Sequence, residues 1–137
     1  MKLLVTLLTA TMLFITNSII AQNKTITVTV VNITSDAGKV GFALYNKDNF
    51  MKTPVQGTNG KIVNRKSTVI FENVPAGEYA VVCYHDKNNN DKLDFSPQRI
   101  PLEDYGASNN HMAFAPPTFE NAKFIVSDKN VSLDIKF

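Results

Sequence analysis

Hydrophobic and polar residues alternate with a period of two along much of the chain beyond residue 22. The clearest case is the last segment, where Val131, Leu133, Ile135 and Phe137 are separated by single polar residues. Such alternation is typical of a strand that has one face on a core and the other in water. No longer window carries the apolar stripe of an amphipathic helix. The pattern therefore predicts an almost entirely β protein.

Further segments show strand patterns of the same kind. They lie at Thr25–Ile33, at Val40–Leu44, around Val69 and Phe71, at Glu78–His85 and at Ala122–Ser127. Turn residues separate the first two segments, which predicts that these two form a hairpin. The segment Glu78–His85 is apolar on both faces, so we expect a central strand that is covered on both sides. Strands with this spacing predict a single antiparallel β-sandwich with about 6–8 strands.

Two stretches lack the alternation. The stretch Asn46–Lys66 is polar and rich in Gly, Asn and Pro, and we expect a loop with at most one short strand near Lys61–Val63. The stretch His85–Asn121 is too long for a passive connection in a domain of this size, and it contains several aromatic residues. We expect it to be one long ordered loop that packs on the sandwich and carries any chemistry.

The start of the chain has a different character from the rest. Leu3–Ile20 is an almost unbroken run of apolar residues and threonine after Lys2, and it ends at the small residue Ala21. This pattern predicts a signal peptide at residues 1–21, followed by a β-sandwich domain at residues 22–137. The alternative is an uncleaved membrane anchor, since the run is close to the shortest length that spans a bilayer. Cleavage would leave an exported protein, periplasmic or secreted, with no membrane span.

Composition narrows the possible functions. The chain has 137 residues, of which 44% are hydrophobic and 19% charged, and its net charge is +2. These values exclude a disordered polyelectrolyte, and the near-neutral charge gives no support for a nucleic-acid partner. The single cysteine, Cys83, excludes an internal disulfide and lies in an apolar run, so we interpret it as a buried structural thiol.

One short segment has the spacing of a cation-binding loop. Oxygen-bearing side chains stand at Asp86, Asn88, Asn90 and Asp94, and the backbone carbonyl of Lys92 would complete the set. In a tight turn with this D-x-N-x-N spacing, alternate side chains point toward one position, where their oxygens can bind one hard cation. Neutral and anionic oxygens suit calcium better than zinc or copper. The spacing therefore predicts a calcium-type ion in this loop.

The same segment departs from the usual calcium loop in two places. Asp91 occupies the position where glycine normally permits the sharp turn, and Pro97 occupies the position where a glutamate normally closes the site. The alternative interpretation is a turn rich in Asp and Asn whose side chains cap their own backbone without an ion.

The two histidines suggest a second function class. His85 and His111 bracket the long loop, so they could meet near Asp86 and act as a small metal-assisted hydrolase. Two histidines do not by themselves form a zinc site. The competing interpretation is that His85 is a structural histidine at the end of a central strand and that His111 is exposed.

Several short sequence words occur in a specific order along the chain. They are Val74-Pro75-Ala76-Gly77-Glu78-Tyr79-Ala80, His85-Asp86-x-Asn88-x-Asn90-x-x-Leu93-Asp94, Ile100-Pro101-x-Glu103-x-Tyr105-Gly106-x-Ser108-Asn109-Asn110, and Pro116-Pro117-x-Phe119-x-x-Ala122-x-Phe124. Together they resemble the domain of unknown function 2141 family of exported bacterial proteins, which is common in Bacteroidota. The resemblance implies a small secreted or periplasmic β-sandwich of immunoglobulin-like or prealbumin-like type, with no established activity. The chain departs from that family where glycines are usual, at Asn89, Asp91 and Ala115.

These observations together favour a non-enzymatic, exported β-sandwich that acts as a binding or envelope-associated accessory module. Its ligand would be an envelope component, a glycan or a protein. The polar groups of Tyr105-Gly106 and Ser108-Asn109-Asn110 have two interpretations. They fasten the long loop over one end of the sandwich, or they form one polar ligand pocket with the loop Asp86–Asp94.

Overall fold

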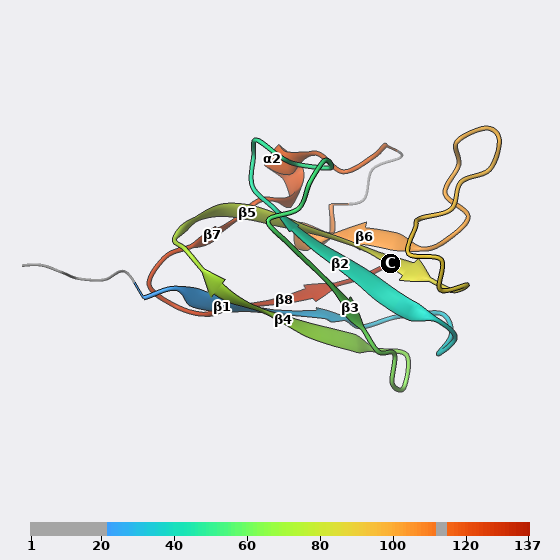
Figure 1. The fold of residues 1–137 in the computed structure, drawn as a ribbon, viewed down its shortest axis with the longest axis horizontal. Helices are drawn as coiled ribbons and strands as arrows, with labels where there is room; N and C mark the ends of the chain where they lie inside the picture. The colour runs from blue at the N-terminus through green and yellow to red at the C-terminus, as the bar shows by residue number, and fades with distance from the viewer. Residues whose placement is uncertain (1–21, 112–114) are drawn as a thin grey trace, which may run out of the picture.

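The structure is a computed structural model that describes residues 22–111 and 115–137. The predicted signal peptide, residues 1–21, lies outside the described residues. The described chain forms two β-sheets that face each other (Figure 1). One sheet has three strands in the order β4-β1-β8, and the other has five, in the order β3-β2-β5-β6 with β7 also paired to β5. The predicted all-β sandwich is confirmed.

The elements follow one another along the chain with mostly short connections. The strands are β1 (Lys24–Val30), β2 (Lys39–Tyr45), β3 (Gln56–Gly60), β4 (Ser67–Val74), β5 (Gly77–Asp86), β6 (Tyr105–Ala107), β7 (Phe124–Val126) and β8 (Val131–Ile135). Two short helices, the 3-10 helix η1 (Ser108–Asn110) and α2 (Phe119–Ala122), lie between β6 and β7. Among the described helices, none has the length and apolar character needed to cross a membrane.

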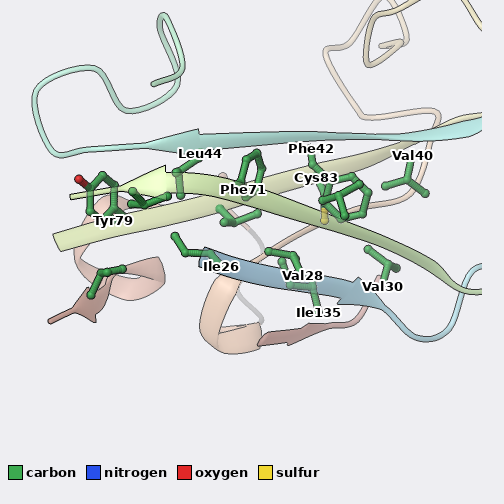
Figure 2. Packing of buried hydrophobic residues seen from close by; sticks show 14 of the residues in the cluster. Ile26, Val28, Val30, Val40, Phe42, Leu44, Phe71, Tyr79, Cys83 and Ile135 are labelled. Atoms are coloured by element: carbon green, nitrogen blue, oxygen red, sulfur yellow. The ribbon is translucent and has the colours of Figure 1, made fainter. Parts of the chain in front are cut away.

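The hydrophobic core lies between the two sheets, and Figure 2 shows its side chains pointing toward one another from both layers. The three-stranded sheet contributes Ile26, Val28, Val30, Val69, Phe71 and Ile135, and the five-stranded sheet contributes Val40, Phe42, Leu44, Tyr79, Val81 and Cys83. All of these residues are buried. The alternation seen in the sequence therefore identifies the inward face of each main strand.

The predicted hairpin between the first two strands is wrong. β1 pairs with β4 and β8, whereas β2 pairs with β3 and β5, so the chain crosses between the sheets after β1. The pairing of β1 with β8 is also parallel, which corrects the expectation of an antiparallel sandwich in this one place. Alternation shows which face of a strand is buried, but it does not identify the strand beside it.

The stretch Asn46–Lys66 contains a strand where we expected a loop. β3 has the sequence Gln-Gly-Thr-Asn-Gly and pairs along its length with β2. It forms one edge of the five-stranded sheet, and three of its five residues are exposed. An edge strand held by backbone hydrogen bonds needs no apolar alternation, so the sequence carried no signal for it. The expected strand near Lys61–Val63 is reduced to a single bridge between Val63 and Lys66.

Within residues 22–111 and 115–137, the segments that lie over the outer face of the five-stranded sheet cover it only in part. At one end of β5, Ala80 packs under Phe119 and Ala122 of α2 and makes a second, smaller apolar cluster. Toward the other end, the outward-facing Val82 and Tyr84 are only partly buried. The segment that follows β5 lies on the same side of the sheet as α2 (Figure 1). The predicted central strand is confirmed, and its outer face divides into a covered end and an open end.

Candidate functional site

The loop after β5 is organised by a buried carboxylate. Asp86 is fully buried, and its carboxylate accepts hydrogen bonds from the backbone N–H groups of Asn90 (3.0 Å) and Asp91 (2.9 Å). These bonds close a tight turn in which Asn89 (φ 59°) and Asp91 (φ 62°) adopt the left-handed conformation. Asn and Asp tolerate this conformation better than other residues with a side chain. The missing glycines therefore do not prevent the sharp turn.

Three of the predicted cation ligands meet at the centre of this loop. The Asn88 Nδ2 donates to Asp94 at 2.7 Å, and the Asn90 Nδ2 donates to the two Asp94 carboxylate oxygens at 2.9 and 3.0 Å. The Lys92 N–H donates to the Asn90 Oδ1 at 3.0 Å. The five predicted residues thus lie in one compact loop. These are the hydrogen bonds of a turn capped by its own side chains, in which the Asn88 and Asn90 Oδ1 atoms accept backbone N–H groups and the Nδ2 groups face Asp94.

A lysine from the neighbouring strand reaches into the same loop. The Lys39 Nζ lies 2.5 Å from the Asp91 Oδ1 and 3.7 Å from the Asp86 Oδ2. The hydrogen bond from Lys39 lowers the pKa of Asp91, and the same bond raises the pKa of Lys39. The ammonium group therefore balances part of the negative charge of the loop. Any metal ion bound in this loop would share the Asp86 and Asp91 carboxylates with the Lys39 ammonium group.

Glu103 holds the base of the segment between β5 and β6. Its side chain is buried, and its two carboxylate oxygens accept the backbone N–H groups of Lys87 (2.9 Å) and Asp94 (3.1 Å). The Leu102 N–H donates to the Asp94 carbonyl at 2.8 Å, directly beside this pair. Glu103 thus joins both ends of the Asx-rich loop, residues 86–94. Our sequence analysis missed this role because a glutamate in a segment without alternation resembles any surface acid.

The open end of the five-stranded sheet forms the floor of an apolar groove of about 660 Å³. The floor consists of Ala43 and Tyr45 of β2 together with Val82 and Tyr84 of β5. Tyr84 lies beside Gly41, where an added Cβ would come within 2.6 Å of the tyrosine ring. The absence of a side chain at Gly41 therefore allows the ring to lie flat on the sheet and leaves space above it. Burial raises the pKa of both tyrosines, so their hydroxyls stay neutral at physiological pH.

The walls of the apolar groove come from two parts of the segment between β5 and α2. One wall is a small hairpin, residues 93–101, in which Phe95 bridges to Pro101 and the Ser96 N–H donates to the Ile100 carbonyl. The other wall contains residues 115–117, which include the proline pair. Phe95 and Ile100 are 53% and 62% exposed. Such exposure of large apolar side chains beside a hollow is typical of a ligand-binding surface.

The three residues proposed for a metal-assisted hydrolase lie in different surroundings. His85 is fully buried, with its Nε2 2.8 Å from the Ala37 carbonyl and its ring stacked on Phe137. Asp86 caps the Asx-rich loop, whereas His111 is exposed beyond η1. Within residues 22–111 and 115–137, no group of three or more His, Cys, Asp or Glu side chains is placed to hold a metal. The described structure does not assemble that constellation.

The residues Ser108, Asn109 and Asn110 fasten the end of the long segment to the sandwich. The buried Ser108 hydroxyl accepts the Val81 N–H at 3.0 Å and donates to the Ala122 carbonyl. The Asn109 Nδ2 donates to one backbone carbonyl within α2 and to one just after it, and the Asn110 Nδ2 donates to one in β8, at 2.8 to 3.1 Å. Their polar groups are used to hold neighbouring backbone. These residues therefore fasten the long segment to the sandwich, which was the first of our two interpretations of them. The groove described above is apolar, whereas the second interpretation was a polar pocket.

Comparison with known proteins agrees with the architecture. A family model described as "Uncharacterized protein conserved in bacteria (DUF2141)" matches residues 28–134. The chain belongs to this family. The match runs from β1 to β8, so both sheets and the long segment between β5 and β6 belong to the DUF2141 domain. No curated protein and no solved structure matches this DUF2141 protein.

Proposed function

We propose that this DUF2141 protein is a non-enzymatic binding module that holds its ligand in the apolar groove above β2 and β5. The observation that carries the proposal is the groove itself: about 660 Å³ of space lies between a tyrosine-lined floor and two ordered walls. This volume falls in the range of about 300 to 1,000 Å³ that is usual for small-molecule sites. Aromatic and proline side chains offer apolar contact, and the neutral tyrosine hydroxyls offer hydrogen bonds at fixed positions.

An uncharged fluorescent dye that brightens in apolar surroundings, Nile red, tests the groove. We expect saturable binding to the intact protein. Ala43→Phe places a ring on the groove floor and should reduce the affinity at least about tenfold, because it removes the space that the dye needs. Ala76→Phe is the matched control, since Ala76 is exposed in the turn between β4 and β5, outside the groove. Equal dye binding by both variants would contradict the proposal.

We also propose that a calcium-type ion orders the Asx-rich loop beside the groove wall. Support comes from the convergence of Asn88, Asn90 and Asp94, whose polar atoms lie within hydrogen-bond distance of one another. The Asp86 carboxylate is committed to backbone N–H groups and shares charge with Lys39, so the affinity should be modest. The ion would stabilise the loop in the conformation described above.

Thermal melting in increasing calcium concentrations tests the ion. A cation that binds only the folded state must raise the melting temperature. Asp94→Asn should abolish the rise, because it replaces a carboxylate by a neutral amide of the same shape. Asp128→Asn, at an exposed position between β7 and β8, should leave the rise unchanged. A melting temperature that does not respond to millimolar calcium would remove the ion from the proposal and leave the groove intact.

The location is proposed on the N-terminal pattern alone. A mature protein recovered from the periplasmic or extracellular fraction should begin at or near Gln22 when its N-terminus is sequenced. Recovery of the intact chain from the membrane fraction would instead indicate an uncleaved anchor.

A further inference from the structure

One charged residue lines an otherwise uncharged groove. Among the described residues that line the apolar groove, only Arg99 carries a charge. Arg99 lies at the turn of the wall hairpin, where its N–H donates to the Ser96 carbonyl at 2.9 Å and its backbone has a φ of 61°. The turn therefore fixes the backbone of Arg99, which lines the groove together with Phe95 and Ile100 of the same hairpin.

The guanidinium of Arg99 has no acidic partner in the described part of the chain. Four of the described lysines have such partners, among them Lys39, which contacts Asp91, and Lys123, which contacts Glu120 at 2.7 Å, whereas the remaining described cations, Arg99 among them, have none. No ion pair of this kind involves Arg99 in residues 22–111 and 115–137. Its five N–H donors are thus available to an anion that arrives with a ligand.

From this arrangement we propose that the ligand is a single-chain anionic amphiphile, whose apolar chain lies in the groove and whose acidic head group binds Arg99. This inference rests on the proposed binding function of the groove. The apolar chain would lie on Tyr84 and against Phe95, and the head group would receive two parallel N–H donors from the guanidinium. The tyrosine rings and the one cation are complementary to the two ends of such a molecule.

The shape of the site favours one bound molecule over a membrane surface. A bilayer is contacted by convex apolar protrusions, whereas the space here is a hollow of about 660 Å³ with walls on two sides. Ile100 of the wall hairpin and Leu102 just after it are large apolar residues with 62% and 63% exposure. These exposed side chains suggest a competing possibility, in which the hairpin tip docks on a lipid membrane. The experiment below distinguishes this possibility from the binding of a single molecule in the groove.

The test compares two ligands of equal chain length, decanoate and decanol, below the concentration at which either aggregates. Binding to the full mature protein is measured by displacement of Nile red at pH 8, where decanoate is ionised. We expect decanoate to bind about tenfold more tightly than decanol, which is the fold-change that one exposed charge-assisted contact supports. High salt should reduce the difference, because the contact is electrostatic and exposed.

Arg99→Gln should reduce the roughly tenfold preference for decanoate over decanol to about one. Arg99→Lys should retain part of the preference, since it keeps the charge without the planar fork. Arg65→Gln is the matched control, because Arg65 is also an exposed arginine with a positive φ (59°), at the turn between β3 and β4. It should retain the full preference.

Each outcome decides one of the two proposals. Equal binding of both ligands, unchanged in Arg99→Gln, would overturn the anionic ligand and leave the groove standing. Failure of both ligands and of Nile red to bind would overturn the binding function as well. Binding to anionic phospholipid vesicles without displacement of the dye by decanoate would assign the hairpin tip to a membrane and overturn the single-molecule ligand.

Discussion

Replacement of Glu103 tests the role of the buried carboxylate that joins the ends of the Asx-rich loop. Its two oxygens accept backbone N–H groups at 2.9 and 3.1 Å in a buried position. Hydrogen bonds to a charged group contribute about 1.5 to 3 kcal/mol each. Water can replace part of the hydrogen bonding that is lost when the Glu103 carboxylate is removed, because Lys87 is exposed. We therefore expect Glu103→Ala to cost about 2 to 4 kcal/mol and Glu103→Gln, which keeps one acceptor, about half as much.

The assay for Glu103 needs both a global and a local measurement. Urea unfolding gives the free energy of unfolding, and Glu72→Ala provides the control, because Glu72 is an exposed glutamate on β4. The loop can also open without global unfolding, so amide hydrogen exchange should be measured at Lys87 and Asp94. Both amides should lose protection in Glu103→Ala. Unchanged exchange at these two amides, or an unfolding cost no larger than that of Glu72→Ala, would refute the assignment.

Three further predictions concern the scaffold. Gly38→Ala should lower the free energy of unfolding in urea by more than about 1 kcal/mol, because Gly38 has a φ of 75° and an added Cβ would collide with the backbone where β5 ends. Gly57→Ala is the control and should lower it much less, because the atom nearest to the added Cβ is 3.7 Å away. Ser108→Ala should cost about 1 to 3 kcal/mol, because it leaves the buried Val81 N–H without its acceptor, and a cost near zero would contradict this. Burial raises the pKa of the Cys83 thiol and keeps it from reagents in solution, so iodoacetamide should modify Cys83 only at urea concentrations that unfold the protein. Rapid labelling of the folded protein would contradict this prediction, because it would show that the thiol is accessible.

The sequence allowed most of the core strands to be located but not paired. Ile26, Val28 and Val30 are apolar at every second position because they face the core, and this spacing is visible without a structure. Their neighbours, β4 and β8, are selected by contacts between residues far apart along the chain, which no local pattern reports. β3 was missed for a related reason, since its residues contribute backbone pairing and almost no apolar surface.

The candidate sites were predictable to different degrees. The Asx-rich loop was found because its ligand spacing is local, and the structure places Asp86 and Asp94 in one turn as that spacing requires. The groove was not found, because its floor and its two walls come from strands and loops that are separate in sequence. The apolar outer face of Glu78–His85 did carry a partial signal, which we interpreted as a face covered along its whole length. Only the end near Ala80 is covered in that way.

The position of β1 also affects when the protein can fold. β1 lies between β4 and β8, and Ile26 to Val30 pair in register with Val131 to Ile135. The residues after these two strands are joined as well, since Asn32 and Phe137 exchange two hydrogen bonds of 2.8 and 2.9 Å. Contacts between such distant residues require a large loss of chain entropy before they form, which slows folding. The three-stranded sheet can therefore close only after the last strand has been synthesised, so β1 waits for its partner β8 until the whole domain is present.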